Sequence, residues 1–337
     1  MARQRSAAAR ERRLAAALRA VEARFGRGVV ERLREIRPRY DTRAIPSGSL
    51  GLDLATGLDG LPRGRLTELL GAPSSGKTAL LYAALAATQR QGGLAALIDA
   101  EGSADAAALR ACGVDLDGLL IARPTSATDA FLLLTILARC GGLDVLGLAS
   151  VAALRDLPLA TAPTSAAAEP RAYDLARLVA RGLRVLMAGL RDGPTAVIVT
   201  NDLVPHLPGY RSVGGLALRH YAALRVAVEP QELLWDIAGG VRALRVRLAI
   251  VKHKLGAPGG RAEVEVAVGQ GLDREGELLQ LALAAGLVAR DDLGYLYGEE
   301  PLGRSIGAAR RRLLADPALA EGLASDIKAA HRRSTAA

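Results

Sequence analysis

Eight residues that follow a short apolar run constrain the fold of this chain more than any other feature. They match the pattern G-x-x-x-x-G-K-[ST] and read Gly71, Ala72, Pro73, Ser74, Ser75, Gly76, Lys77 and Thr78. The apolar run Leu66–Leu70 precedes them and the helical run Ala79–Thr88 follows, which is the strand–loop–helix context of a phosphate-binding loop. Its glycines let backbone N–H groups surround phosphates. Lys77 is expected to reach the β- and γ-phosphates, and the Thr78 hydroxyl to bind Mg²⁺.

Apolar runs alternate with helix-length segments, which predicts an α/β fold with a mostly parallel sheet. The expected strands are Leu66–Leu70, Ala95–Ala100, Asp144–Ala149, Thr195–Asn201, Arg245–Lys254 and Ala262–Val268. The last two are close together along the chain and are expected to pair antiparallel. We expect a basic N-terminal helix and linker at 1–40, a core at 41–271 and a small C-terminal α/β domain at 272–337.

Positive charge is concentrated at the N-terminus. Residues 1–40 hold twelve arginines and four glutamates, which is +8 of the +9 carried by the whole chain. A helix is expected over 10–26, with Leu14, Leu18, Val21 and Phe25 on one apolar stripe. The stripe favours packing on another surface, such as a neighbouring subunit. The basic face favours nucleic acid or an acidic partner, although a solvated helical face explains the same charges.

The composition excludes several classes of protein. Half of the 337 residues are hydrophobic, which is enough for a large core and excludes disorder as the main state. The apolar runs are too short to span a bilayer, and no apolar segment of signal-peptide type follows the N-terminal arginines. Two cysteines, Cys112 and Cys140, do not make a disulfide framework. We therefore expect a soluble cytoplasmic protein.

Lysine is rare in this chain, at four of the 44 basic residues. Three of the four are Lys77, Lys252 and Lys254, which all lie in motifs. Because arginine is used almost everywhere else, a lysine indicates a position where a compact point charge is preferred to a planar fork.

Two acidic residues, Asp99 and Glu101, follow the apolar run that begins at Ala95. Their spacing is expected to place both on one side of the strand end. A carboxylate beside a bound γ-phosphate can orient or deprotonate an attacking water. Ordinary acids at a strand end are the alternative.

Several segments, taken together, resemble the bacterial RecA recombinase family in order and spacing. They are Ile45–Asp53, Gly60–Arg65, the phosphate loop, Ile98–Glu101, Ser150–Leu154, Gly214–Leu218 and Val251–Lys254. The resemblance implies an ATPase core between a protomer-docking N-terminal helix and a small C-terminal domain. It also implies a filament on single-stranded DNA, with ATP and Mg²⁺ at subunit boundaries, that pairs homologous strands and stimulates repressor self-cleavage after DNA damage.

The resemblance assigns roles to individual positions. Glu101 matches the family's water-activating glutamate, and Asp105 its adenine-contacting aspartate. Lys252 and Lys254 match lysines that reach the ATP of the neighbouring subunit. Two further residues, Arg177 and Arg184, match positions near bound DNA, although plain surface arginines are the alternative.

Other positions depart from the family pattern. Ala149 stands where an aspartate that organises Mg²⁺ is expected, and alanine cannot hold a hydrated metal. Asp202 stands where a glutamine normally senses the γ-phosphate. We expect Asp202 to supply the missing metal-side charge together with Thr78. The first DNA-facing loop, Thr161–Arg171, lacks the family's glycines.

The second DNA-facing loop, Leu203–Val213, is shorter than in the family and carries Tyr210 and Arg211 as candidate DNA contacts. Two functions stay open at this point. One is an ATP-dependent recombinase that binds single-stranded DNA and acts in recombination, repair and the SOS response, with a LexA-type repressor as a possible partner. The other is a nucleotide-binding paralogue with little hydrolysis, an ImuA-type adaptor that works with translesion polymerase components. Ala149 and Asp202 favour the adaptor, and Glu101 with Lys252 and Lys254 favours the recombinase.

Overall fold

A computed structural model of the chain describes residues 2–26, 29–30, 44–155, 172–190, 193–205, 210–292 and 294–336. The chain divides into two compact units at residues 41 and 42. The first unit contains α1, Ala2–Phe25, which is longer than the predicted helix and contains most of it. The apolar side chains of Leu14 and Phe25 are exposed on α1.

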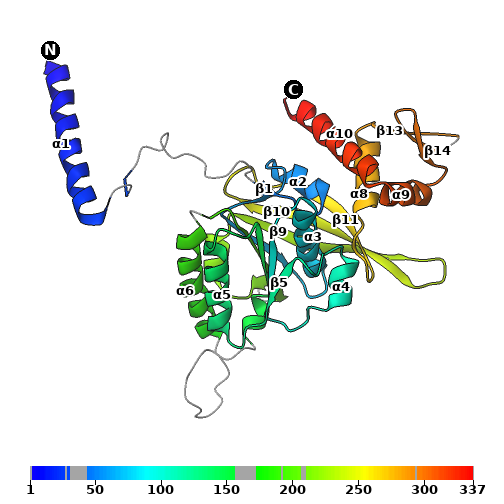
Figure 1. Ribbon diagram of the computed structural model, residues 1–337, viewed down its shortest axis with the longest axis horizontal. Coiled ribbons are helices and arrows are strands. Elements are labelled where there is room, and N and C mark those ends of the chain that lie inside the picture. Colours follow the sequence, from blue (N-terminus) through cyan, green and yellow to red (C-terminus); the bar gives the residue numbers. More distant parts are fainter. Residues whose placement is uncertain are drawn as a thin grey trace, which may run out of the picture. The chain divides into compact units, whose positions relative to one another are not determined.

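The second unit is built on a large sheet, which Figure 1 shows with helices packed against it. Its strand order is β12-β11-β10-β9-β3-β7-β6-β4-β5. Its central strands run parallel: β5 Leu119–Ala122, β4 Ala95–Asp99, β6 Val145–Ala149, β7 Ala196–Pro205, β3 Leu66–Gly71 and β9 Leu224–Trp235. The antiparallel extension adds β10 Val241–His253, β11 Arg261–Ala267 and β12 Gly271–Leu272. The predicted mixed α/β class and the antiparallel pair are therefore confirmed. Strands β5 and β9 were not predicted.

Helices cover both faces of the parallel strands. On one face, α3 Lys77–Arg90 and α4 Ala106–Ala111 contribute to a core cluster with the strands. On the other face lie α5 Ala127–Arg139, α6 Ala172–Leu190 and α7 Leu216–Tyr221, which form a second cluster. The helix α3 is buried on nearly every side because it is almost wholly apolar from Leu80 to Thr88. This burial fixes the direction in which its N-terminus points.

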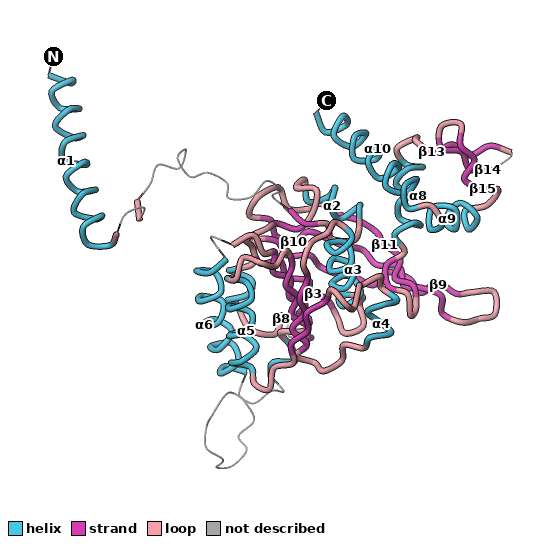
Figure 2. The backbone as a smooth tube through the Cα atoms, in the orientation of Figure 1, coloured by secondary structure: helices cyan, strands magenta, loops and turns pink. Residues whose placement is uncertain are grey.

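Past the sheet, β9 and β10 continue as a two-stranded ribbon (Figure 2). The short strand β8, Tyr210–Ser212, pairs with the end of β7. Near the start of the second unit, β1 Ala44–Ile45 pairs with β2 Leu61–Pro62 around the helix α2, Leu50–Thr56. Among the described helices, none is long and apolar enough to cross a membrane.

The C-terminal segment forms a third apolar cluster. It contains α8 Arg274–Ala284, the sheet of β13 Val288–Asp291, β14 Gly294–Tyr297 and β15 Glu300–Gly303, α9 Ile306–Ala315 and α10 Pro317–Ala336. Leu50 of α2 belongs to the same cluster, so the segment packs directly on the core. The domain boundary at 271 and 272 stays a prediction.

A buried carboxylate joins this segment to the core. Glu277 of α8 accepts hydrogen bonds from the Ser49 hydroxyl at 2.6 Å, the Leu50 N–H at 3.0 Å and the Gly51 N–H at 2.9 Å. These donors lie at the first turn of α2, where N–H groups have no partner within the helix. Glu277 therefore caps α2 from a distant part of the chain.

Replacing this carboxylate tests the cap. We expect Glu277→Ala to lower the free energy of unfolding by about 2–4 kcal/mol, because three buried donors lose their acceptor. Urea unfolding measures the change. The exposed Gln280 on the same helix provides the control. Its replacement by alanine is expected to change stability by less than about 0.5 kcal/mol. Equal effects of the two variants would contradict the capping role.

Two buried acids also make stability depend on pH. Burial raises the pKa of Asp53 to about 8 and that of Glu277 to about 7. In the unfolded chain both carboxyl groups lose their protons near their ordinary pKa values of 3.8 and 4.5. In the folded chain both groups keep their protons to higher pH. Stability is expected to fall as pH rises from about 5 to about 8, by about 1.4 kcal/mol per pH unit for each retained proton.

Urea unfolding across this pH range measures the slope. The double variant Asp53→Asn/Glu277→Gln is expected to show a shallower fall than the parent chain. A parent slope that the variant leaves unchanged would exclude these two groups as its source.

Candidate functional site

The loop between β3 and α3 has the backbone that a phosphate loop requires. Ser74 and Gly76 have positive φ angles of 60° and 99°. Gly71 lies so close to its surroundings that a Cβ atom there would come within 2.5 Å of both the Ser75 hydroxyl and the Val228 carbonyl. The residue at position 71 must therefore be glycine for the loop to close in this way. The loop then leads into the N-terminus of α3, whose 14 residues give it a full helix dipole.

Lys77 has its ammonium group inside this loop. Its Nζ lies 3.2 Å from the Gly71 carbonyl oxygen, 2.6 Å from the Ala72 carbonyl oxygen and 3.0 Å from Asp202 Oδ1. Only 8% of the lysine side chain is exposed, against 30% of the aspartate side chain. An ammonium has three N–H donors, and here each has an acceptor from the protein itself.

The sheet register brings Asp202 to this position. Strands β3 and β7 are parallel neighbours, and Gly71 pairs directly with Asp202. The sequence predicted that Asp202 lies beside the metal. In the structure, Asp202 forms an ion pair with Lys77 of the phosphate loop. Its metal role stays a prediction.

The loop residues fit a phosphate group. The Ser75 hydroxyl oxygen is buried and has no hydrogen-bond partner among the described residues. Such a group is costly unless it finds a partner. The exposed Ala72, Pro73 and Ser74 leave the outer side of the loop open. Protein ligands for a metal are few, because no group of three or more His, Cys, Asp or Glu side chains with metal-binding geometry occurs in the described part of the chain. Thr78 and Asp202 would hold Mg²⁺ only together with phosphate and water oxygens, as is usual for this ion.

The two acids after β4 have different environments. The strand ends at Asp99, which is 2% exposed and accepts the N–H groups of Ser103 and Ala104, both at 3.1 Å. Glu101 lies beyond the strand, is exposed, and accepts the Ser103 hydroxyl at 3.2 Å. The strand stops before Glu101, so strand alternation does not fix the position of this side chain. Both carboxylates nevertheless contact Ser103, and their placement on one side stays a prediction. Asp99 has a structural role, and Glu101 alone is free to face a ligand.

Ala149 ends the neighbouring strand β6 and pairs with Asp99 in the parallel register. Its carbonyl accepts the N–H groups of Ala100 and Glu101 at 2.7 and 3.2 Å. The backbone at position 149 thus helps to fix the turn that carries Glu101, while the methyl side chain is buried. No acid from this strand reaches the loop.

A buried polar network beneath the loop was not predicted from the sequence. Glu68 of β3 is fully buried, accepts the Asn201 amide at 2.8 Å and forms an ion pair with Arg225 of β9 at 2.5 Å. Asn201 in turn accepts the N–H of Asp202 at 3.0 Å. This chain of contacts holds the end of β7 in place, and with it the carboxylate that contacts Lys77. A glutamate in an otherwise apolar strand was the available signal.

Lys252 and Lys254 lie together at the carboxyl end of α7. The Lys252 ammonium donates to the carbonyls of Arg219 and His220, and the Lys254 ammonium donates to the same His220 carbonyl at 2.8 Å. Cations are favourable at this end of a helix. Burial, followed by the charges of Lys254 and Arg225, lowers the pKa of Lys252 to about 8. No hydrogen bond or ion pair between described residues joins these two lysines to the phosphate loop of their own chain.

The remaining predicted site residues are spread over the surface. Arg177 and Arg184 are exposed on α6, seven positions apart and so on one face of the helix. Asp105 caps α4 by accepting the Ala108 N–H at 2.9 Å. Tyr210 and Arg211 belong to β8, and their side chains lie outside the described part of the structure, as does the loop Thr161–Arg171. The DNA-binding role of these residues stays a prediction.

Comparison with known proteins identifies the family. A family model described as the RecA N-terminal domain matches residues 12–273. The chain belongs to the RecA family. The RecA protein of Thermus thermophilus is 36% identical over 316 residues, which cover 92% of each chain. The RecA protein of Clavibacter michiganensis is 36% identical over 328 residues, covering 96% of this chain and 89% of the relative. That of Kineococcus radiotolerans is 37% identical over 325 residues, covering 95% and 92%.

The contact between Lys77 and Asp202 can be tested by nucleotide binding, because RecA-family proteins bind ATP with Mg²⁺. We expect Asp202→Asn to tighten ADP binding without Mg²⁺ by about two- to fivefold, since the ammonium no longer has to leave a carboxylate. A fluorescent ADP analogue measures the affinity. Asp117→Asn is the control, because it removes the same charge from an exposed position away from the loop. Unchanged ADP affinity would contradict a competing ion pair.

The same variant tests the metal role predicted for Asp202. With Mg²⁺ present, that role requires Asp202→Asn to abolish Mg-ATP binding, whereas the ion pair alone does not. An affinity for Mg-ATP equal to that of the parent chain would rule out Asp202 as a metal ligand.

Proposed function

We propose that the chain is an ATP-dependent recombinase of RecA type that assembles on single-stranded DNA as a filament or homo-oligomer. It would act in the cytoplasm, in homologous recombination, DNA repair and the SOS response, with a LexA-type repressor as a candidate partner. The observation that carries the proposal is the phosphate loop, in which a glycine that admits no side chain, a lysine inside the loop and a helix N-terminus converge. The match to RecA proteins over nearly the whole chain supports it.

In this proposal each residue has a definite task. Lys77 would exchange Asp202 for a phosphate oxygen, which moves one positive charge from a protein partner to the ligand. Thr78 would bind Mg²⁺, and bound ATP with Mg²⁺ would supply the phosphoryl chemistry. Glu101 would orient or deprotonate the attacking water, since it is exposed just past the carboxyl end of β4, at the edge of the sheet where the phosphate loop also begins.

The two remaining lysines would act between subunits. Lys252 and Lys254 already hold two positive charges at one point of the surface, stabilised by carbonyls at the end of α7. We propose that they reach the phosphates bound by the neighbouring protomer, so that ATP strengthens the subunit contact. Arg177, Arg184, Tyr210 and Arg211 are proposed as contacts to DNA, and Asp105 as a contact to adenine.

A second function is favoured by one specific observation. Lys77 already has a carboxylate partner, and no acid from β6 reaches the site, because Ala149 ends that strand. The positive charge of Lys77 is then neutralised by the protein, and the acid that would organise the metal is absent from β6. These two features favour a protein that binds nucleotide but hydrolyses it slowly. Such a chain would act as an ImuA-type adaptor, with translesion polymerase components as partners.

Steady-state ATP hydrolysis with and without single-stranded DNA distinguishes the two functions. The recombinase is expected to turn over ATP faster with DNA than without it, well above a Lys77→Ala blank. Glu101→Gln is expected to reduce this rate by about a hundredfold, the usual contribution of a general base. Nucleotide binding without turnover, in the presence of DNA, would instead support the adaptor.

A further inference from the structure

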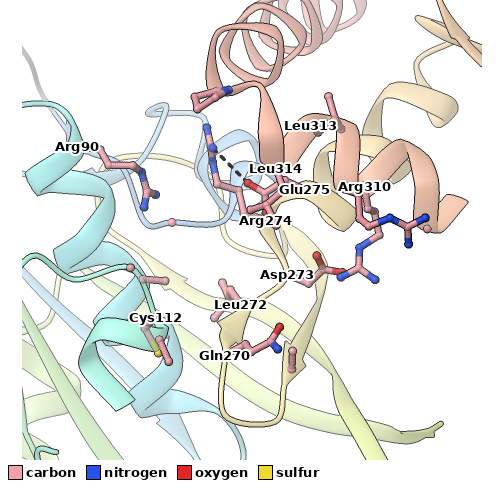
Figure 3. A pocket seen from close by; sticks show the side chains of 18 residues that line it. Arg90, Cys112, Gln270, Leu272, Asp273, Arg274, Glu275, Arg310, Leu313 and Leu314 are labelled. Atoms are coloured by element: carbon pink, nitrogen blue, oxygen red, sulfur yellow. Dashed lines mark ion pairs between the residues drawn. The ribbon is translucent and has the colours of Figure 1, made fainter. Parts of the chain in front are cut away.

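A cavity lies near the C-terminal end of α3, the end opposite the phosphate loop, between the core and the C-terminal segment. Its volume is about 670 Å³, within the range of small-molecule sites. Figure 3 shows Arg90, at the end of α3, on one side of the opening and Arg274 and Arg310 on the other. Arg311 also lines the cavity. The helix α3 has 14 residues, so Arg90 is about 20 Å from Lys77 along its axis, and the cavity is separate from the phosphate loop.

The four arginines exceed the acids that line the cavity. Asp273 pairs with Arg310 at 2.6 Å, and Glu275 pairs with Arg274 at 3.6 Å. Arg274 also contacts Glu321 at 2.5 Å. Within the described ranges, neither Arg90 nor Arg311 has an ion pair or a hydrogen bond. Two guanidinium groups of the described chain therefore line the cavity without a direct ion pair, and the acids Glu275 and Glu321 act on Arg90 only from a greater distance.

Two effects disfavour the charge on Arg90, and the nearby acids Glu275 and Glu321 offset them in part. Partial burial, followed by the nearby charge of Arg274, lowers the pKa of Arg90 from its ordinary value. An arginine stays charged under all ordinary conditions, so the unfavourable interaction with Arg274 is not relieved by loss of a proton. An anion between the two groups would relieve it.

Part of the wall is apolar. Leu272, Leu313, Leu314 and Pro317 line the same cavity. Leu314 is 67% exposed and so is accessible to a ligand in the cavity. A ligand that fits both halves of the wall has an anionic head and a compact carbon body.

We propose that this cavity binds a small organic phosphate, with Arg90 and Arg311 as the groups that contact the phosphate. The planar guanidinium fork matches two phosphate oxygens at once, which makes arginine the suitable residue at both positions. The site does not depend on nucleotide binding at the phosphate loop. The same phosphate chemistry could come from a nucleic-acid backbone, and the experiment separates that source from a small molecule.

Calorimetry with ribose 5-phosphate and with pyrophosphate tests the proposal. The full chain carries Lys77→Ala, so that the phosphate loop lacks its ammonium. We expect both probes to bind, and Arg90→Gln/Arg311→Gln to weaken binding at least about tenfold, the effect of losing charge-assisted hydrogen bonds. The control Arg12→Gln/Arg19→Gln removes two exposed arginines of α1 and is expected to change affinity less than about twofold.

A second variant guards against loss of folding. Arg90→Lys/Arg311→Lys keeps both charges but removes both forks, so it is expected to bind the probes with intermediate affinity. Failure of the parent chain to bind either small phosphate would overturn the proposal. So would binding of only a single-stranded oligonucleotide, if it depended on Arg90 and Arg311, because the site would then belong to a nucleic-acid backbone.

Discussion

The parallel pairing of β3 with β7 determines the character of the candidate site. This register sets Gly71 beside Asp202, and the loop that begins at Gly71 returns Lys77 to the same point. Backbone hydrogen bonds of the sheet, rather than the side chains themselves, thus bring the two opposite charges within 3.0 Å. Beneath them, Glu68 and Asn201 hold β7 in position through a fully buried network. The sheet register therefore determines which carboxylate lies beside Lys77.

The two proposed functions differ in the free energy available to displace Asp202 from Lys77 when nucleotide binds. A ligand phosphate must compete with Asp202 for the ammonium, and the outcome depends on how strongly the ligand binds elsewhere. A neighbouring subunit that contributes Lys252 and Lys254 would add such binding. The chain alone would then hold nucleotide weakly, and the assembled protein would hold it tightly. In the recombinase, subunit assembly would supply the free energy that nucleotide needs to displace Asp202. In the adaptor, assembly would not supply it.

Much of the fold could be predicted from the sequence. The mainly apolar runs at Leu66–Leu70 and Asp144–Ala149 became parallel strands that are buried on both faces, as their composition predicts. The strand β9 was missed because its second half, from Glu229 to Trp235, is exposed and contains Pro230. Its stability comes from pairing with β10, a contact between strands that periodicity within one segment does not reveal.

The site was predicted in part, for a similar reason. Local patterns identified the phosphate loop, since eight consecutive residues carry all of its signal. They failed for the partner of Lys77, because Asp202 is more than a hundred residues away and its position depends on strand order. They also could not fix the relation of Asp99 to Glu101, which depends on where β4 ends.

The cap that Glu277 places on α2 has a consequence for how the chain acquires its fold. The hydrogen bond between Ser49 and Glu277 joins residues 228 positions apart. During synthesis, the first turn of α2 can be capped only after most of the protein has been made. Contacts between distant residues slow folding, because a long loop must close before they form. The first turn of α2 therefore gains its acceptor only after α8 has left the ribosome. A truncated chain that ends before α8 would leave the N–H groups of Leu50 and Gly51 without this acceptor and would expose the Leu50 side chain. Exposed apolar surface of this kind promotes aggregation.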